Sequence, residues 1–362
     1  DGDGDIQLAM TAVLIGFAAG QVVYGPLSDR FGRRPLLCFG LVLYALASIL
    51  CAGSTNLGEL LAGRLLQGLG GAAGLVLARA IILDRWTGAE ASRVLSLVAA
   101  ITFMMPVCAP LIGGYLAWVA HWPLVFWLQA AVGALCLLGV GALLSPGRGA
   151  DSHASVAHSL LAYVDLVRDR EVWLYMACMG CGHAGVMAFV SNSAFVFISH
   201  LGLQPHAYGL CFSVVMLGGA AGAWLNGRLV VRRGIAALLS LGTVIVAVSG
   251  TAALLATTVA GGLWAILMPS LCYTFGMAFI FSNAIAHVLS RFRDRAGSAA
   301  AVVGVSQFLA GALAASALSL NDTPSPLPLA VALAAGGLAS AGLWWGWIRR
   351  RRAVRVSPSR AV

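Results

Sequence analysis

Long apolar runs separated by short polar segments dominate the pattern of this chain. A membrane-spanning helix needs about 20 mostly apolar residues, and eleven runs approach or exceed that length. They cover residues 6–24, 36–52, 60–83, 94–119, 123–144, 172–198, 208–229, 235–256, 263–286, 298–320 and 327–348. The runs lack the alternating pattern of barrel strands. The pattern therefore predicts an all-α, polytopic membrane protein.

Composition and charge agree with that prediction. Hydrophobic residues make up 60% of the chain and charged residues 10%, whereas soluble domains carry about 25% charged residues. All 22 basic residues are arginines, and they give a net charge of +9. Twenty of them lie in alternate loops and in the tail, at 30–34, 85–93, 148–170, 228–233, 291–295 and 349–360. This distribution follows the positive-inside rule, so it predicts a cytoplasmic C-terminus and does not favour a nucleic-acid partner.

The polar interval 145–171 separates five spans from six. We predict an N-terminal bundle over 1–144, a cytoplasmic linker over 145–171, a C-terminal bundle over 172–348 and a basic cytoplasmic tail over 349–362. The odd number of spans predicts one helix preceding the sequence. The halves also repeat, because Gly25, Leu27, Arg30 and Gly32 recur 202 residues later as Gly227, Leu229, Arg232 and Gly234. Such repeats are typical of transporters.

Three motifs carry a resemblance to a known family. Gly25-Pro-Leu-Ser-Asp-Arg-Phe-Gly-Arg-Arg34 resembles the G-x-L-x-D-R-x-G-R-R/K signature of the major facilitator superfamily. Arg64-Leu-Leu-Gln67-Gly68 resembles its R-x-x-Q-G motif, and Pro110-Leu-Ile-Gly113-Gly114 resembles its antiporter motif. Residues 20–26, 79–84 and 108–110 are similar to the Bcr/CflA drug-resistance branch. The resemblance implies two six-helix bundles, with eleven spans visible here.

The signature loop has two interpretations. The arginines could serve only as topology anchors. The resemblance instead implies a cytoplasmic gate, in which Asp29 docks near the start of the helix that begins around Ser298 and Arg33 reaches Asp84. The gate residues would be Gly25, Leu27, Asp29, Arg30, Gly32, Arg33, Arg34 and Asp84. Pro26 and Pro35 are expected to punctuate the helix ends at a short turn.

A second group of polar residues lies within the spans. A charge at membrane depth is costly, so Arg64 is expected to face a cavity with Gln67, and snorkelling towards the outer surface is the alternative. Arg79 is expected to snorkel. His183 lies near the middle of its span and can titrate near neutral pH, so it is a candidate for proton coupling, or else a neutral packed histidine. Cys178, Cys181 and His183 do not predict a metal site.

One helix combines kink and packing residues. Pro106, Pro110, Gly113 and Gly114 are interpreted as the hinge of the antiporter motif. Small residues at Gly218, Gly219 and Gly222 offer a complementary face. Candidate substrate-cavity residues are Gln21, Tyr24, Phe103, Met187, Phe189, Asn192, Tyr273, Asn283 and Gln307, although the aromatic ones would serve equally well in plain packing.

The resemblance implies export of small, mostly apolar drug-like molecules by proton antiport through alternating access, in a bacterial inner membrane. The proton gradient would supply the energy, with no cofactor, and the protein would act as a monomer. A P-loop needs lysine, which this sequence lacks, and clustered histidines or acids for a membrane enzyme are absent. The alternatives are a facilitator of sugars or organic metabolites with the same fold, or a truncated remnant that does not transport.

Overall fold

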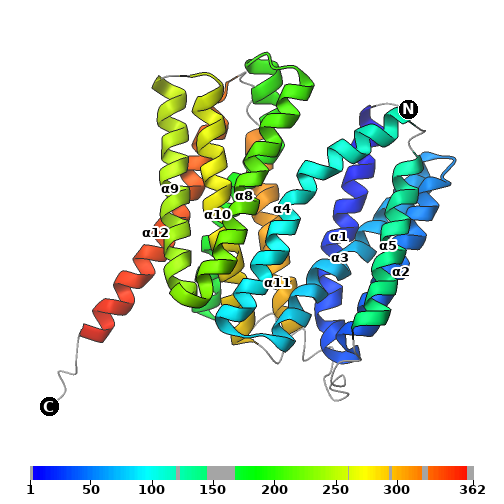
Figure 1. The fold of residues 1–362 in the computed structure, drawn as a ribbon, viewed down its shortest axis with the longest axis horizontal. Helices are drawn as coiled ribbons and strands as arrows, with labels where there is room; N and C mark the ends of the chain where they lie inside the picture. The colour runs from blue at the N-terminus through cyan, green and yellow to red at the C-terminus, as the bar shows by residue number, and fades with distance from the viewer. Residues whose placement is uncertain are drawn as a thin grey trace. The chain divides into compact units, whose positions relative to one another are not determined.

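The computed structural model describes residues 3–119, 123–144, 168–259, 261–292, 296–319 and 325–356, all as helices and their connections, without strands in these ranges (Figure 1). The α-helices are α1 (Asp3–Phe31), α2 (Arg33–Ala52), α3 (Leu57–Arg85), α4 (Gly88–Val119), α5 (Pro123–Leu143), α7 (Arg170–Ala194), α8 (Pro205–Arg233), α9 (Ile235–Val259), α10 (Leu263–Arg291), α11 (Ala296–Ser319) and α12 (Leu327–Val356). A π-helical segment, Phe195–His200, extends α7.

Among the described residues, ten helices are long and apolar enough to cross a membrane, and α11 contributes the shorter apolar segment Ala296–Gly311. Large apolar side chains cover the outer faces of these helices. On α5, Leu135 and Leu138 are about 70% exposed, which is expected where lipid rather than water covers the surface. The predicted all-α, polytopic architecture is confirmed, with one described helix for every predicted span.

The signature loop contains a shorter turn than we predicted. Helix α1 continues to Phe31 with Pro26 inside it, and α2 begins at Arg33, so Pro35 lies in its first turn. The expectation that both prolines punctuate helix ends is therefore wrong for Pro26, because an internal proline can bend a helix without ending it. The break occurs at Gly32, whose φ of +88° a residue with a side chain adopts only under strain.

The second copy of the repeat breaks in the same way. Helix α8 ends at Arg233, and Gly234 follows with φ +80° and ψ 160°. The corresponding values at Gly32 are 88° and 159°. The two glycines that match in sequence therefore also match in backbone conformation, which supports duplication of the half-domain.

Contacts divide the chain into two compact units. Unit 1 contains Asp1–Trp86, Cys108–Arg168 and Leu289–Val305, and unit 2 contains Thr87–Val107, Asp169–Val288 and Ser306–Val362. Each unit consists mainly of one half of the sequence. The exceptions are the beginning of α4, which belongs to unit 2, and the beginning of α11, which belongs to unit 1. These two helix beginnings are central to the candidate site.

Small residues allow close helix packing within unit 1. Helix α1 packs on α3, while α2 packs on both α3 and α5. A Cβ atom added at Gly20 would lie 2.6 Å from Ala72 Cβ and 2.8 Å from Leu69 O. One added at Gly70 would lie 2.6 Å from Tyr44 N. Close backbone approach of this kind is a principal source of stability between membrane helices.

Unit 2 is organised in a similar way around α7, α9, α10 and α12. Helix α12 packs on α7 and α9. A Cβ atom added at Gly337 would clash with Val246 O of α9 and would lie 2.8 Å from Val246 C and 3.0 Å from Ala247 Cα. Tyr273 of α10 is fully buried and donates a hydrogen bond to Gly182 O of α7 at 3.0 Å. Phe189 and Phe279 are among the other large buried side chains.

Candidate functional site

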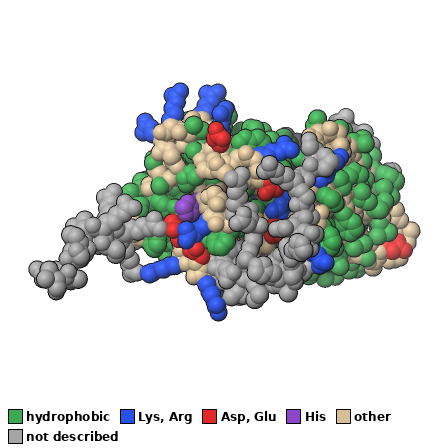
Figure 2. Space-filling view, turned by 90° about the horizontal axis from the view of Figure 1, so that it is seen from below, with side chains coloured by type: hydrophobic (Ala, Val, Ile, Leu, Met, Phe, Trp, Pro, Cys, Tyr) green, Lys and Arg blue, Asp and Glu red, His purple; other side chains and the backbone are tan. Residues whose placement is uncertain are grey.

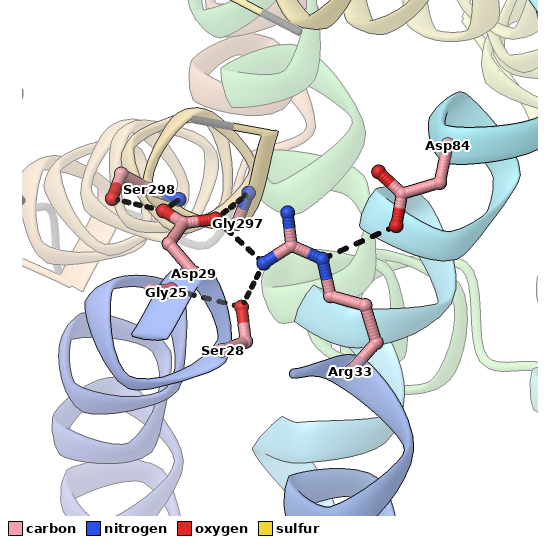
Figure 3. A network of polar contacts seen from close by, with 7 residues as sticks. All are labelled: Gly25, Ser28, Asp29, Arg33, Asp84, Gly297 and Ser298. Atoms are coloured by element: carbon pink, nitrogen blue, oxygen red, sulfur yellow. Dashed lines mark hydrogen bonds and ion pairs between the residues drawn. The ribbon is translucent and has the colours of Figure 1, made fainter. Parts of the chain in front are cut away.

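Asp29, near the end of α1, accepts hydrogen bonds from the first turn of α11. Its carboxylate receives the backbone N–H groups of Gly297 and Ser298, both at 3.1 Å, and the Ser298 hydroxyl at 2.7 Å (Figure 3). The first N–H groups of a helix have no partner within the helix and carry partial positive charge. An anion placed there accepts hydrogen bonds from these N–H groups and balances their partial positive charge. The expected docking of Asp29 at the start of α11 is thus present in unit 1.

Arg33 also binds this carboxylate, at the oxygen that Gly297 N–H contacts. Its Nη1 donates to Asp29 Oδ1 at 2.5 Å and to Ser28 Oγ at 2.7 Å, while its Nε donates to Asp84 Oδ2 at 3.3 Å (Figure 3). Only 5% of the Asp29 side chain is exposed, against 41% for Asp84. The guanidinium therefore bridges a buried acid on α1 and a more exposed acid at the end of α3. We call Asp29, Arg33, Asp84 and the first turn of α11 the rim lock.

Close approach of the backbone makes the rim lock possible. A Cβ atom added at Gly297 would lie 2.6 Å from Gly25 O and 2.8 Å from Asp29 Oδ1, and it would also contact Ser28 Oγ. The Ser28 hydroxyl donates to Gly25 O at 2.8 Å. The sequence interpretation missed Ser28 and Gly297. The sequence did offer a signal for Gly297, because it is a glycine directly before Ser298, where the helix was expected to begin.

The remaining predicted gate residues surround this lock without entering its hydrogen bonds. Gly25 is buried, Leu27 is half-buried, and Arg30 is exposed, with its guanidinium 5.1 Å from the centre of the Phe31 ring. Arg34 donates to Gly141 O near the end of α5 at 2.7 Å, where a cation is favoured by the helix dipole. Arginines also gather on the face of the molecule shown in Figure 2.

Another polar network of unit 1 lies towards the opposite end of α3 from Asp84. Arg64 Nη1 donates to Gln67 Oε1 at 2.8 Å, and Gln67 Nε2 donates to Ser48 Oγ at 2.8 Å and to Gln129 Oε1 at 2.7 Å. The Arg64 guanidinium also lies 5.6 Å from the centre of the Phe126 ring. Gln67 therefore links α2, α3 and α5 while it orients Arg64, as the R-x-x-Q spacing on one helix face allows.

The expectation that Arg79 snorkels is wrong, because only 4% of this residue is exposed. Gly304 of α11 lies close by, and a Cβ atom added there would be 3.8 Å from Arg79 Nη1 and in contact with Gln21 Oε1. Gln21 is 1% exposed, and neither atom of its amide has a hydrogen-bond partner among the described residues. A glycine on α11 thus leaves room for two buried polar side chains, Gln21 and Arg79.

His183 lies near the middle of α7 and is 8% exposed. Its Nε2 is 3.4 Å from Gln307 Nε2 on α11, and its ring is 6.3 Å from that of Phe281. The histidine is therefore buried within unit 2, with Gln307 and Phe281 among its neighbours. This placement is compatible with either a proton carrier or a neutral packed histidine.

The predicted hinge of α4 is described only in part. Pro106 is half-buried, whereas the burial of Pro110, Gly113 and Gly114 lies outside what the structure describes. On the facing helix, a Cβ atom added at Gly219 would lie 2.5–2.8 Å from the Phe103 ring of α4. Gly218 and Gly222 instead face α10, so the small-residue face of α8 serves two neighbours rather than α4 alone.

The predicted cavity residues are divided between the two units. Gln21 and Tyr24 lie in unit 1, and the others lie in unit 2. Six are buried, namely Gln21, Tyr24, Phe189, Tyr273, Asn283 and Gln307, while Phe103, Met187 and Asn192 are half-buried. A cavity of about 790 Å³ in unit 2 is instead lined by side chains of α7, α11 and α12 such as Cys181, Ala314 and Ala335.

Comparison with known proteins agrees with this architecture. A family model described as "Major Facilitator Superfamily" matches residues 2–315. The chain is 33% identical over 323 residues to the "Uncharacterized MFS-type transporter YdgK" of Bacillus subtilis, covering 88% of this chain and 80% of that protein. It is 28% identical over 313 residues to the "Bicyclomycin resistance protein homolog" of Haemophilus influenzae, covering 86% and 79%.

The fold is also similar to that of the solved transporter FucP in its outward conformation. The TM-score is 0.76 at 16% identity, covering 99% of this chain and 91% of that one, which shows a shared fold. The protein is therefore a multi-pass membrane transporter and not an enzyme. It belongs to the major facilitator superfamily, and the names of its drug-resistance relatives support the resemblance to the Bcr/CflA-type branch.

Proposed function

We propose that this protein exports small, mostly apolar drug-like molecules by alternating access, in exchange for protons. Relatives named for resistance to bicyclomycin and chloramphenicol and for multidrug resistance support the substrate class. Membership of the superfamily supports secondary transport, in which two helical bundles rock about a site near the membrane midplane.

The rim lock is the observation that carries this proposal. Asp29 ties the end of α1 to the beginning of α11, and α11 continues beyond Val305 as part of unit 2. Hydrogen bonds to a charged acceptor contribute about 1.5–3 kcal/mol each. A contact of that strength between helices that must separate is suited to a gate. It closes the arginine-rich side in one state and is broken in the other.

We also propose that the arginine-rich helix ends face the cytoplasm of a bacterial inner membrane. The last turns of α1, α3, α8 and α10 carry Arg30, Arg85, Arg232 with Arg233, and Arg291. Basic residues at alternate loops set orientation in this sense. The C-terminus would then be cytoplasmic, and the transporting species would be a monomer.

Proton coupling is assigned to polar groups at membrane depth. His183 is the candidate proton carrier because a histidine ring can bind and release a proton and this one lies near the middle of α7. Arg64, held by Gln67, would stabilise a substrate or a carboxylate that approaches its guanidinium. Charged residues within a membrane usually mark such pathways.

The test is accumulation of a phenicol antibiotic in cells that express the protein, with and without a protonophore. We expect low accumulation that rises to the empty-vector level when the proton gradient collapses. Asp29→Asn should reduce export about tenfold without changing the amount of protein in the membrane. Glu59→Gln is the matched control, since Glu59 caps the opposite end of α3 through Thr55 and takes no part in the rim lock.

Each alternative has its own signature in this assay. Accumulation that equals the empty-vector control, with folded protein in the membrane, refutes export of phenicols and favours a metabolite facilitator or a non-transporting remnant. Export that persists unchanged after the gradient collapses refutes proton antiport. Full export by Asp29→Asn would leave the arginines as topology anchors only.

A further inference from the structure

A second polar network in unit 2 joins the beginning of α4 to α8 and α10. Ser92 Oγ donates to Asn283 Oδ1, Asn283 Nδ2 donates to Asn226 Oδ1, and Asn226 Nδ2 donates to Ser96 Oγ, each at 2.7 Å. Ser96 Oγ in turn donates to Ser92 O at 2.6 Å. Four side chains from three helices thus form a continuous chain of hydrogen bonds.

All four side chains are fully buried, each at 0% exposure. An amide buried without partners costs several kcal/mol in apolar surroundings, so each asparagine depends on the others for satisfaction. Asn283 Nδ2 also donates to Phe279 O at 2.8 Å. This engagement explains why Asn283, which we predicted to line the substrate cavity, is better described as a residue that holds helices together.

The position of Asn226 in the sequence repeat links this network to the rim lock. The 202-residue offset that matches Gly25 with Gly227 also matches Asp29 with Val231, which is 52% exposed. The second half therefore has no carboxylate at the position that carries the rim lock in the first half. Its polar contact comes instead from Asn226, directly before Gly227 on α8.

Close packing accompanies the second contact as it does the first. A Cβ atom added at Gly227 would lie 3.3 Å from Ser96 Cβ and 3.5 Å from Arg93 O. The glycine that matches Gly25 thus lies against the beginning of α4, just as Gly25 lies against the beginning of α11. Helix α4 belongs to unit 2 up to Val107 and to unit 1 from Cys108 onward.

We propose that Ser92, Ser96, Asn226 and Asn283 form an uncharged clasp, a second gate that must open whenever the arginine-rich side of the transporter opens. The inference rests on the alternating access proposed above. The rim lock relies on a carboxylate and a guanidinium, whereas no ionised group takes part in the clasp. The two duplicated halves would thus close the same side by different chemistry.

The test uses a buried reporter one turn from the clasp. Ala223 of α8 is 0% exposed and packs against Ala99 of α4 and Ala278 of α10. The Ala223→Cys variant is treated with N-ethylmaleimide in proteoliposomes. Labelling at position 223 is quantified by peptide mass spectrometry, which separates it from the native cysteines. With the clasp intact, the introduced thiol is expected to react slowly because the closed clasp shields it.

Asn226→Leu and Asn283→Leu keep the side-chain volume and remove the hydrogen bonds. Each is expected to raise the labelling rate about tenfold, which corresponds to about 1.4 kcal/mol. Thr274→Val is the matched control, because Thr274 is 1% exposed and donates from α10 to Val215 O of α8 at 2.7 Å without involving α4. It should leave the rate unchanged.

Two results would overturn the clasp. One is labelling of both leucine variants at the parental rate, and the other is an equal rise in Thr274→Val, which would indicate general loosening. If the leucine variants do not fold, Ser92→Ala and Ser96→Ala remove one hydroxyl each and should raise the rate about threefold; unchanged rates there refute the proposal. Labelling requires neither substrate nor a proton gradient. The labelling result therefore tests the clasp even if phenicol export is not observed.

Discussion

A single methyl group at Gly297 should disable the rim lock without changing any charge. Gly297 is the second residue of α11, and its N–H donates to Asp29. In Gly297→Ala, the new Cβ atom would lie 2.6 Å from Gly25 O and 2.8 Å from Asp29 Oδ1. The first of these contacts is with backbone, so the beginning of α11 has to move away from α1.

The size of the effect follows from these distances. Ordinary contact begins at 3.4 Å, so the Gly25 contact requires a shift of at least 0.8 Å, the difference between 3.4 and 2.6 Å. The same shift lengthens the two 3.1 Å hydrogen bonds to Asp29 to about 3.9 Å, beyond bonding distance. Losing both costs about 3 kcal/mol at the low end. The higher helix propensity of alanine favours α11 equally in the closed and open states, so it does not offset this loss.

The loss of about 3 kcal/mol corresponds to a shift of about 100-fold away from the closed state. The reporter is Ala301→Cys, since Ala301 is 1% exposed and lies one turn after Gly297 on the same face of α11. The rate at which the introduced thiol reacts with N-ethylmaleimide should rise by about that factor in Gly297→Ala. Phenicol export should fall in the same variant.

The control is Gly209→Ala in the first turns of α8, where an added Cβ atom meets nothing within 4 Å. This change should leave labelling at position 301 unaltered. The reasoning is refuted if Gly297→Ala reacts at the parental rate, because the clash would then be absorbed without opening the lock. An equal increase in Gly209→Ala would attribute the effect to helix destabilisation.

Three further predictions follow from the same geometry. Gly32→Ala and Gly234→Ala should each lower the free energy of unfolding by about 1–3 kcal/mol, because both φ values are positive; thermal unfolding in detergent measures this, and no loss relative to Gly74→Ala would contradict it. Arg33→Lys should raise labelling of the Ala301→Cys reporter about fivefold, since an ammonium cannot bridge the acceptors that the guanidinium fork joins; parental labelling would show that charge alone suffices. His183→Gln should abolish the dependence of export on the proton gradient while the protein still binds substrate, and an unchanged response to protonophore would exclude His183 as the proton carrier.

Much of the fold could be predicted from local features of the sequence. A bilayer offers no hydrogen-bond partners to an exposed backbone, so long apolar runs have to become helices. The arginine loops indicated which helix ends lie together, and the signature identified Asp29, Arg33 and Asp84 as partners. The turn itself was harder to place, because Pro26 suggested a helix end whereas the conformation of Gly32 determined it.

The sequence by itself determined the helical membrane architecture, the duplication and the charged partners of the rim lock, because these depend on hydropathy, spacing and motif. Only the tertiary structure decided which small and neutral residues meet. Gly297 against Gly25, Arg79 beside Gly304, and Asn283 within the clasp involve residues from helices far apart along the chain. The identity of a glycine or asparagine does not predict which residue it contacts, since hydrogen bonding and close packing depend on positions in space that one sequence pattern does not encode.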